Sequence, residues 1–225
     1  MTDALAGYMR SKKGAKVGVI TDTTAYGAAF GDSMVTSVKS ATMSVTARAT
    51  YDPAATDYSG QILRIKRADV DSLFVEGYSE SVAKLVSQAR SLGITAPIYA
   101  SPDVYDNTAF KAGGAALDGV VFASPYVAND NAESTTFQSS WEAEHHAVPT
   151  FTEDVLYEGV AVLVRALHSA GASPTASTIG SALDGLQMDL PSGHFAFSPG
   201  HSRAAAPVYV GKVENGAATL ISTVH

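Results

Sequence analysis

Polar and aromatic side chains follow three apolar runs of the chain, at the point where each run ends. The residues are Thr24 and Tyr26 after the first run, Gly77 and Tyr78 after the second, and Asp103 after the third. Tyrosine supplies a flat apolar face with a hydrogen-bonding hydroxyl, and a carboxylate pairs with an ammonium group or accepts from a hydroxyl. Because parallel strands end at the same edge of a sheet, we expect these residues to form a binding edge for a small amphipathic ligand.

Other interpretations of polar residues in the sequence are weaker. The run "GYSES" lacks the second glycine of a hydrolase nucleophile elbow, because Ser81 stands in its place. His145 and His146 lie near Glu142, but adjacent helical residues point about 100° apart, which predicts a solvated helix end. Asp22 ends a strand, as the phospho-acceptor of a receiver-like fold does. Such a site also needs two acids at the end of the preceding strand and a lysine at the end of a later strand, and the sequence has neither. We therefore predict no catalytic residue and no metal site.

Composition narrows the class of protein further. The 225 residues are 46% hydrophobic and 16% charged, which is typical of a packed globular chain. A net charge of −7 without a basic cluster predicts no nucleic-acid partner, and the absence of cysteine excludes disulfides and thiolate chemistry. No apolar run approaches the roughly 18 residues that a membrane helix needs. Residues 1–14 lack the apolar centre of a signal peptide, so we expect a cytosolic chain or a longer precursor.

Strand and helix patterns alternate through the first half of the chain. We expect strands at 16–22, 43–52, 71–77, 97–101 and 119–126, and helices at 2–13, around 30–38, at 57–68 and at 79–92. Strands separated by helices indicate crossover connections and a parallel sheet. The predicted fold class is therefore α/β, with residues 1–126 forming a doubly wound lobe.

The pattern changes after this lobe. Residues 132–186 read as three helices without a strand between them, so their apolar faces need another element to cover them. Trp141, Val160, Leu163 and Leu167 belong to these faces, and we expect them to permit self-association. The later runs "GHFAFSPG" and "APVYVGKVENGAATLIS" look like strands, with "ENG" as a hairpin turn.

Several runs of the sequence resemble one known family. They are "KVGVITDTTAYGAAFGDSM", the run from "TYDPAATDYSG" to "SLGI", "GVVFASPY" and "GHFAFSPGHS". Together they resemble the branched-chain amino acid (Leu/Ile/Val) binding proteins of ABC importers, which have the type I periplasmic binding-protein fold. The most specific parts are the run at 51–59, the "GY" at 77–78 and the "G-x-F-x-F-S" pattern near the C-terminus.

The resemblance implies a non-enzymatic two-lobed clamp that binds a small molecule without a cofactor and works with an ABC permease. Residues 1–126 would be the second, C-terminal lobe, 127–186 helices of the first lobe, and 187–225 a closing β segment that returns to the second lobe. Most of the N-terminal lobe would be lacking. The implied location is periplasmic or extracellular. A ligand-sensing regulatory module of the same fold, such as an amide sensor or receptor ectodomain, is the alternative.

The resemblance also implies roles for individual residues. Tyr26, Tyr78 and Asp103 take the places of two ligand-binding tyrosines and of the acid that holds the ligand's ammonium. Asp103 is one methylene shorter than the glutamate of many amino acid binders. In "LYEGV", Tyr157 keeps the aromatic and Glu158 the acid of a motif that the family usually writes Y-D-A. The predicted ligand is an amino acid or a similar small polar organic solute.

Overall fold

The structure is a computed structural model, and it describes residues 1–129, 131–198 and 204–224. The chain divides into two compact units, each described by itself. Unit 1 comprises Met1–Ser124 and Tyr209–Ser222, and unit 2 comprises Pro125–Val208 and Thr223–His225. Within the described part, no helix combines the length and the apolar character that crossing a membrane requires.

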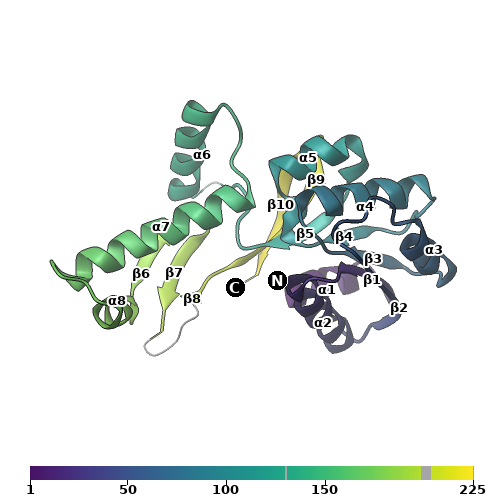
Figure 1. Ribbon diagram of the computed structural model, residues 1–225, viewed down its shortest axis with the longest axis horizontal. Coiled ribbons are helices and arrows are strands. Elements are labelled where there is room, and N and C mark those ends of the chain that lie inside the picture. The colour runs from purple at the N-terminus through teal and green to yellow at the C-terminus, as the bar shows by residue number, and fades with distance from the viewer. Residues whose placement is uncertain (130, 199–203, 225) are drawn as a thin grey trace. The chain divides into compact units, whose positions relative to one another are not determined.

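The first 124 residues alternate between strands and helices (Figure 1). The strands are β1 (Lys16–Asp22), β2 (Ser44–Tyr51), β3 (Ser72–Val75), β4 (Ile98–Ala100) and β5 (Val121–Ser124). The helices are α1 (Thr2–Ser11), α2 (Ala25–Ser40), α3 (Ser59–Arg67), α4 (Ser79–Ser91) and α5 (Asn107–Gly113), with 3₁₀ turns η1 (Pro102–Val104) and η2 (Gly114–Leu117). The five strands and helices α1 to α4 match the predicted order, with ends that differ by a few residues, whereas the helical segments between β4 and β5 were not predicted.

The rest of the chain begins with three helices, as the sequence predicts. They are α6 (Ala132–His145), α7 (Phe151–Ala170) and α8 (Ala176–Leu183). The strands that follow are β6 (Gln187–Leu190), β7 (Gly193–Phe197), β8 (Ala204–Ala205), β9 (Val208–Glu214) and β10 (Ala217–Val224). Residues 199–203, which include part of the "GHFAFSPGHS" run, lie outside the described residues.

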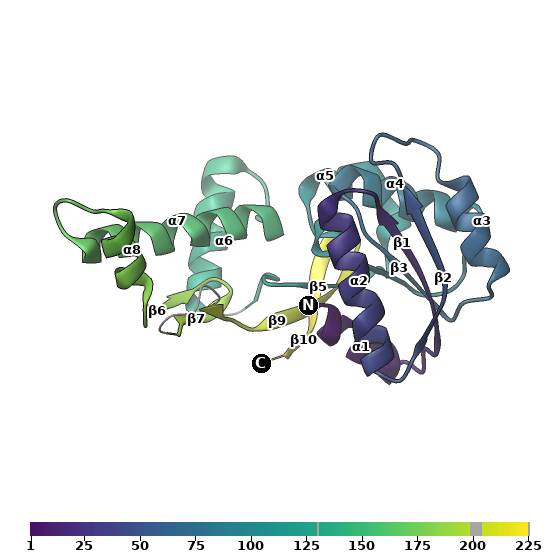
Figure 2. The same cartoon turned by 60° about the horizontal axis from the view of Figure 1, so that its bottom comes forward.

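A seven-stranded sheet forms the centre of unit 1, in the order β10-β9-β5-β4-β3-β1-β2. The strands from β2 to β5 pair in parallel, and β9 joins β5 in the antiparallel direction. Helices α1 and α2 lie on one face of the sheet and α3, α4 and α5 on the other (Figure 1, Figure 2). The architecture is thus the doubly wound, mostly parallel α/β fold that the sequence predicts.

Apolar periodicity explains how the helices of unit 1 pack. Ile62 and Ile65 of α3 are fully buried, as are Val82, Leu85 and Val86 of α4. These residues recur at three- and four-residue spacing, so each helix presents one apolar stripe to the sheet. The sequence predicts both stripes correctly.

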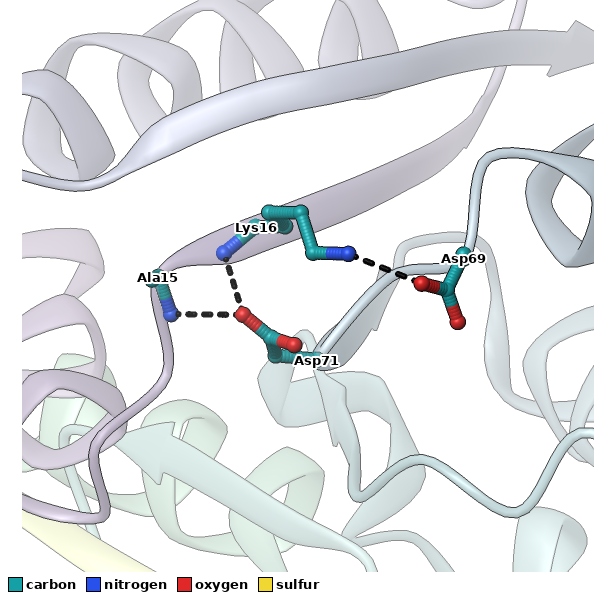
Figure 3. A network of polar contacts seen from close by, with 4 residues as sticks. All are labelled: Ala15, Lys16, Asp69 and Asp71. Carbon is teal, nitrogen blue, oxygen red and sulfur yellow. Dashed lines mark hydrogen bonds and ion pairs between the residues drawn. The ribbon is translucent and has the colours of Figure 1, made fainter.

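A polar network fixes the amino-terminal edge of this sheet (Figure 3). The Asp71 carboxylate accepts hydrogen bonds from the backbone N–H groups of Ala15 (3.2 Å) and Lys16 (2.8 Å). The Lys16 ammonium pairs with Asp69 at 3.0 Å. Both carboxylates belong to the turn before β3, so the network holds that turn against the start of β1.

The five strands described after residue 186 divide between two sheets. Strands β6, β7 and β8 form a separate antiparallel sheet, whereas β9 and β10 complete the seven-stranded sheet of unit 1. The β9–β10 connection is the predicted "ENG" hairpin, in which Asn215 and Gly216 have φ values of 53° and 75°. Two consecutive positive φ angles are the requirement of a type I′ turn, which Asn-Gly meets at low cost.

Candidate functional site

The turn after β1 is built around a helix cap. Thr24 is the N-cap of α2, and its hydroxyl oxygen accepts from the backbone N–H of Gly27 at 3.0 Å. The Thr24 N–H in turn donates to the Asp22 carboxylate at 2.8 Å. A side chain at Gly27 would collide with Asp22, so glycine permits the close approach. The cap fixes where α2 begins and therefore where Tyr26, in its first turn, is held.

Tyr26 joins two of the other predicted residues. Its ring stacks on Tyr78, with centroids 6.0 Å apart and an angle of 26° between the planes. Its hydroxyl donates a hydrogen bond to the Asp103 carboxylate at 3.1 Å. Tyr78 is 53% exposed and Tyr26 37% exposed, so both rings present a face that a solute can reach. Three separate strand ends thus contribute to one cluster, as the sequence predicts from strand topology.

Burial governs the electrostatics of this cluster. It raises the pKa of Asp103 above its ordinary value, and the hydrogen bond from Tyr26 acts against that rise. Burial, followed by the nearby Asp103 charge, raises the pKa of Tyr26 as well. Tyr26 therefore stays a neutral donor, and Asp103 is an acceptor with lone pairs left for a cationic or hydroxyl group.

Gly77 has a packing role in the structure. A side chain there would collide with the hydroxyl of Tyr51, which donates to the backbone carbonyl of Glu76 at 2.9 Å. Only glycine leaves room for that buried hydrogen bond. Gly77 thereby sets the backbone path from β3 to Tyr78, the N-cap residue of α4.

Glu76 is an acid that the sequence analysis missed. It directly follows β3, is 0% exposed, and accepts a hydrogen bond from the Asp22 N–H at 3.2 Å through Oε2. Its Oε1 has no hydrogen-bond partner among the residues that the structure describes. Burial first, and the Asp22 charge second, raise the pKa of Glu76 to about 7. The signal in the sequence is an acid directly after three apolar residues and beside the Gly-Tyr pair.

Unit 2 contains Tyr157 and a second set of buried acids. The Tyr157 ring packs on Phe137 of α6, with centroids 4.8 Å apart. Both rings line a cavity of about 260 Å³, with Leu190 and Pro191 beside them. Tyr157 therefore belongs to a different compact unit from the Tyr26 cluster.

The acid pair of unit 2 lies one helical turn apart on α7. Asp154 is 0% exposed, and within the described part of the chain neither of its carboxylate oxygens has a hydrogen-bond partner. Glu158 accepts from the backbone N–H of Ser192 at 2.6 Å and from its hydroxyl at 2.9 Å. Burial and the neighbouring Glu158 raise the pKa of Asp154. Glu158 thus anchors the β6–β7 turn to α7, and Asp154 is the member of the pair that keeps its proton.

A known protein family matches nearly the whole chain. The sequence profile of the family described as "Periplasmic binding protein" matches residues 1–218 of this chain.

The chain belongs to the periplasmic binding protein family.

Sequence relatives of this periplasmic binding protein are distant. The Leu/Ile/Val-binding protein homolog 3 of Brucella melitensis is 22% identical over 198 residues, which are 87% of this chain and 54% of the relative. The chain thus spans about half the length of that curated relative. The ligands in its name, Leu, Ile and Val, are those of the Brucella protein.

Solved structures share the fold more closely than the sequence. A leucine binding protein from Thermotoga maritima superposes with a TM-score of 0.91 at 21% identity, over 99% of this chain and 64% of that one. A solute binding protein from R. palustris in complex with benzoate has a TM-score of 0.90 at 18% identity, over 99% and 62%. A substrate binding protein from Streptococcus pneumoniae in complex with isoleucine has a TM-score of 0.84 at 20% identity, over 98% and 64%. At such identities the likeness concerns the fold.

Proposed function

We propose that this periplasmic binding protein is the solute-binding component of an ABC importer and takes a small organic solute that carries an ammonium group, such as an amino acid with an apolar side chain. The observation that carries the proposal is the cluster of Tyr26, Tyr78 and Asp103, in which two reachable aromatic rings stack and the hydroxyl of Tyr26 donates to the Asp103 carboxylate. Relatives of this fold include proteins solved with isoleucine and with benzoate. The importer's permease is the proposed partner, and the periplasm or cell exterior the proposed location.

The chemistry of the cluster favours the amine over the aromatic acid. A ligand ammonium can donate to the lone pairs of Asp103 that Tyr26 leaves free, and a charge-assisted bond of this kind is stronger than a neutral one. The rings of Tyr26 and Tyr78 would cover an apolar side chain. A benzoate carboxylate at the same place would meet a like charge, which costs free energy. Thr24 and Gly77 would act by positioning the two tyrosines.

Binding by the 225-residue chain tests the proposal. The chain is titrated with L-leucine, L-isoleucine and benzoate, with ¹³C-labelled tyrosine rings as the NMR reporter so that weak binding is detected. We expect the two amino acids to shift the resonances of Tyr26 and Tyr78 and Asp103→Asn to weaken binding roughly tenfold or more, as the loss of a charged hydrogen bond requires.

Asp69→Asn is the matched control. It removes the same charge from the opposite edge of the same sheet, where the exposed Asp69 pairs with Lys16 (Figure 3). The control should bind like the unmodified chain. Amino acid binding that survives Asp103→Asn unchanged, or tighter binding of benzoate than of either amino acid, would overturn the proposal.

A further inference from the structure

Glu76 is a buried acid directly behind the proposed ligand site, and the proposed binding chemistry does not use it. Its side chain reaches from the end of β3 to the end of β1, where Oε2 accepts from the Asp22 N–H. A side chain at Gly27 would meet both the Asp22 and the Glu76 carboxylates, so the two acids lie against the first turn of α2. Tyr26, one residue before Gly27, belongs to that same turn.

The groups that surround Glu76 are acids and phenols. Asp22 faces it from β1 and Asp103 from η1. Tyr51 of β2 and Tyr26 of α2 lie within electrostatic range of its carboxylate. One oxygen of Glu76 and one of Asp22 have no hydrogen-bond partner in residues 1–129, 131–198 and 204–224. A second negative charge at this place is therefore uncompensated, and a proton is the simplest way to neutralise it.

The protonation of Glu76 is balanced near neutral pH. Burial and the Asp22 charge raise its pKa to about 7. A modest change in the local electrostatic potential therefore changes the fraction of Glu76 that is protonated. A positive charge bound nearby favours the ionised form of an acid, and a negative charge favours the protonated form. Asp103, the proposed partner of the ligand's ammonium, is one of the groups that already act on Glu76.

We propose that Glu76 determines the charge specificity of the site, so that a ligand ammonium bound at Asp103 displaces the Glu76 proton while an aromatic carboxylate requires that proton to stay. This inference rests on the proposed function and deepens it. It assigns Glu76 a role through charge, without contact with the ligand. The structural basis is its burial against Asp22 and its place behind the first turn of α2.

Linked protonation predicts opposite pH profiles for the two ligand classes. If a bound ammonium lowers the pKa of Glu76 by about one, affinity for the amine rises up to about tenfold between about pH 5.5 and about pH 8.5. Affinity for an aromatic carboxylate falls over the same range, because its binding then needs a proton from solution. Near the midpoint, about half a proton is released for each amine bound.

Calorimetry in two buffers with different ionisation enthalpies counts these protons. The probes are L-leucine and benzoate, and the proteins are the unmodified 225-residue chain, Glu76→Gln, Glu76→Asp and Glu80→Gln. Glu80 is an exposed acid on the first turn of α4, so Glu80→Gln removes one glutamate without touching the buried cluster. We expect the unmodified chain and Glu80→Gln to release protons on binding L-leucine, Glu76→Gln to release none, and Glu76→Asp to restore part of the release.

A ligand-free measurement accompanies the calorimetry. In ¹³C NMR of glutamate side-chain carboxyl carbons, one glutamate of the unmodified chain should titrate near pH 7, and that signal should be missing from Glu76→Gln. Titration of Glu76 together with the exposed glutamates would overturn the inference. Leucine binding without proton release, or with equal release in Glu76→Gln, would also overturn it and leave the proposed function standing. Failure of L-leucine to bind at any pH would instead overturn the proposed function, and with it this inference.

Discussion

Replacing Asp154 with asparagine should stabilise unit 2 at neutral pH and leave its stability unchanged in acid. Positions 154 and 158 are one turn apart on α7, which puts their side chains about 6 Å from one another. At an effective dielectric constant of about 20, two negative charges at that distance repel by about 3 kcal/mol. That repulsion adds to burial, which is the larger cause, in raising the pKa of Asp154 above its ordinary value.

The sign of the pH dependence follows from proton binding. The folded chain holds the Asp154 proton more tightly than the unfolded chain, so the free energy of unfolding falls as pH rises through this range. Asparagine is neutral at every pH, and its side-chain amide can donate a hydrogen bond to Glu158. Asp154→Asn should therefore match the unmodified chain near about pH 4 and exceed its free energy of unfolding by about 2 to 3 kcal/mol near about pH 8.

Urea unfolding measures this difference within one unit. Trp141, the single tryptophan, lies on α6 of unit 2, so its fluorescence reports on the unit that contains Asp154. With an m-value of about 1.5 kcal/mol/M, the midpoint should rise by roughly 1 to 2 M at the higher pH. Glu144→Gln, which changes an exposed acid of α6, is the matched control and should shift nothing. A difference that is equal at both pH values, or a destabilised Asp154→Asn at the higher pH, would refute the buried-proton account.

Two further predictions follow from other parts of the structure. Gly77→Ala should destabilise unit 1 by about 2 kcal/mol, because the new methyl group displaces the Tyr51 hydroxyl from its buried hydrogen bond. Near-ultraviolet circular dichroism of the tyrosines during heating measures this loss of stability. Gly7→Ala is its control, since nothing lies within 4 Å of a side chain there and alanine favours the helix, so an equal loss in both variants would contradict the steric explanation. Val160→Glu should abolish concentration-dependent self-association, because Val160 is 61% exposed on the apolar face of α7; light scattering after size exclusion measures this, and an unmodified chain that stays monomeric at every concentration would contradict it.

The fold of unit 1 is predictable from sequence because its signals are local. Apolar runs bounded by turn residues mark β1 to β5, and three- and four-residue spacing marks the buried faces of α3 and α4. The rule that parallel strands end at one edge then places Tyr26, Tyr78 and Asp103 together. Thr24 as a cap is equally local, because its partner is three residues away.

The buried acids are not predictable in this way. Glu76 is buried through contact with Asp22, which is distant in sequence, and periodicity carries no information on such a pair. The protonation of Asp154 depends on Glu158, whose carboxylate accepts hydrogen bonds from Ser192. Ser192 is again distant in the sequence. Strand β6 is only four residues long and has a single fully buried side chain, so its pattern is too weak to read individually. The role of Tyr157 stays a prediction.

The antiparallel pairing of β5 with β9 has a consequence for how the chain folds as it is synthesised. Unit 1 is interrupted after β5 by residues Pro125–Val208 of unit 2, and its sheet is complete only when β9 and β10 have been synthesised. Until then, the growing chain carries an unpaired β5 edge, which can pair with another chain. Unit 2 can therefore fold while residues 125–208 are synthesised, before the sheet of unit 1 is complete. A ribosome pause or a chaperone that shields the β5 edge would therefore matter most between residues 125 and 208, before the last two strands emerge.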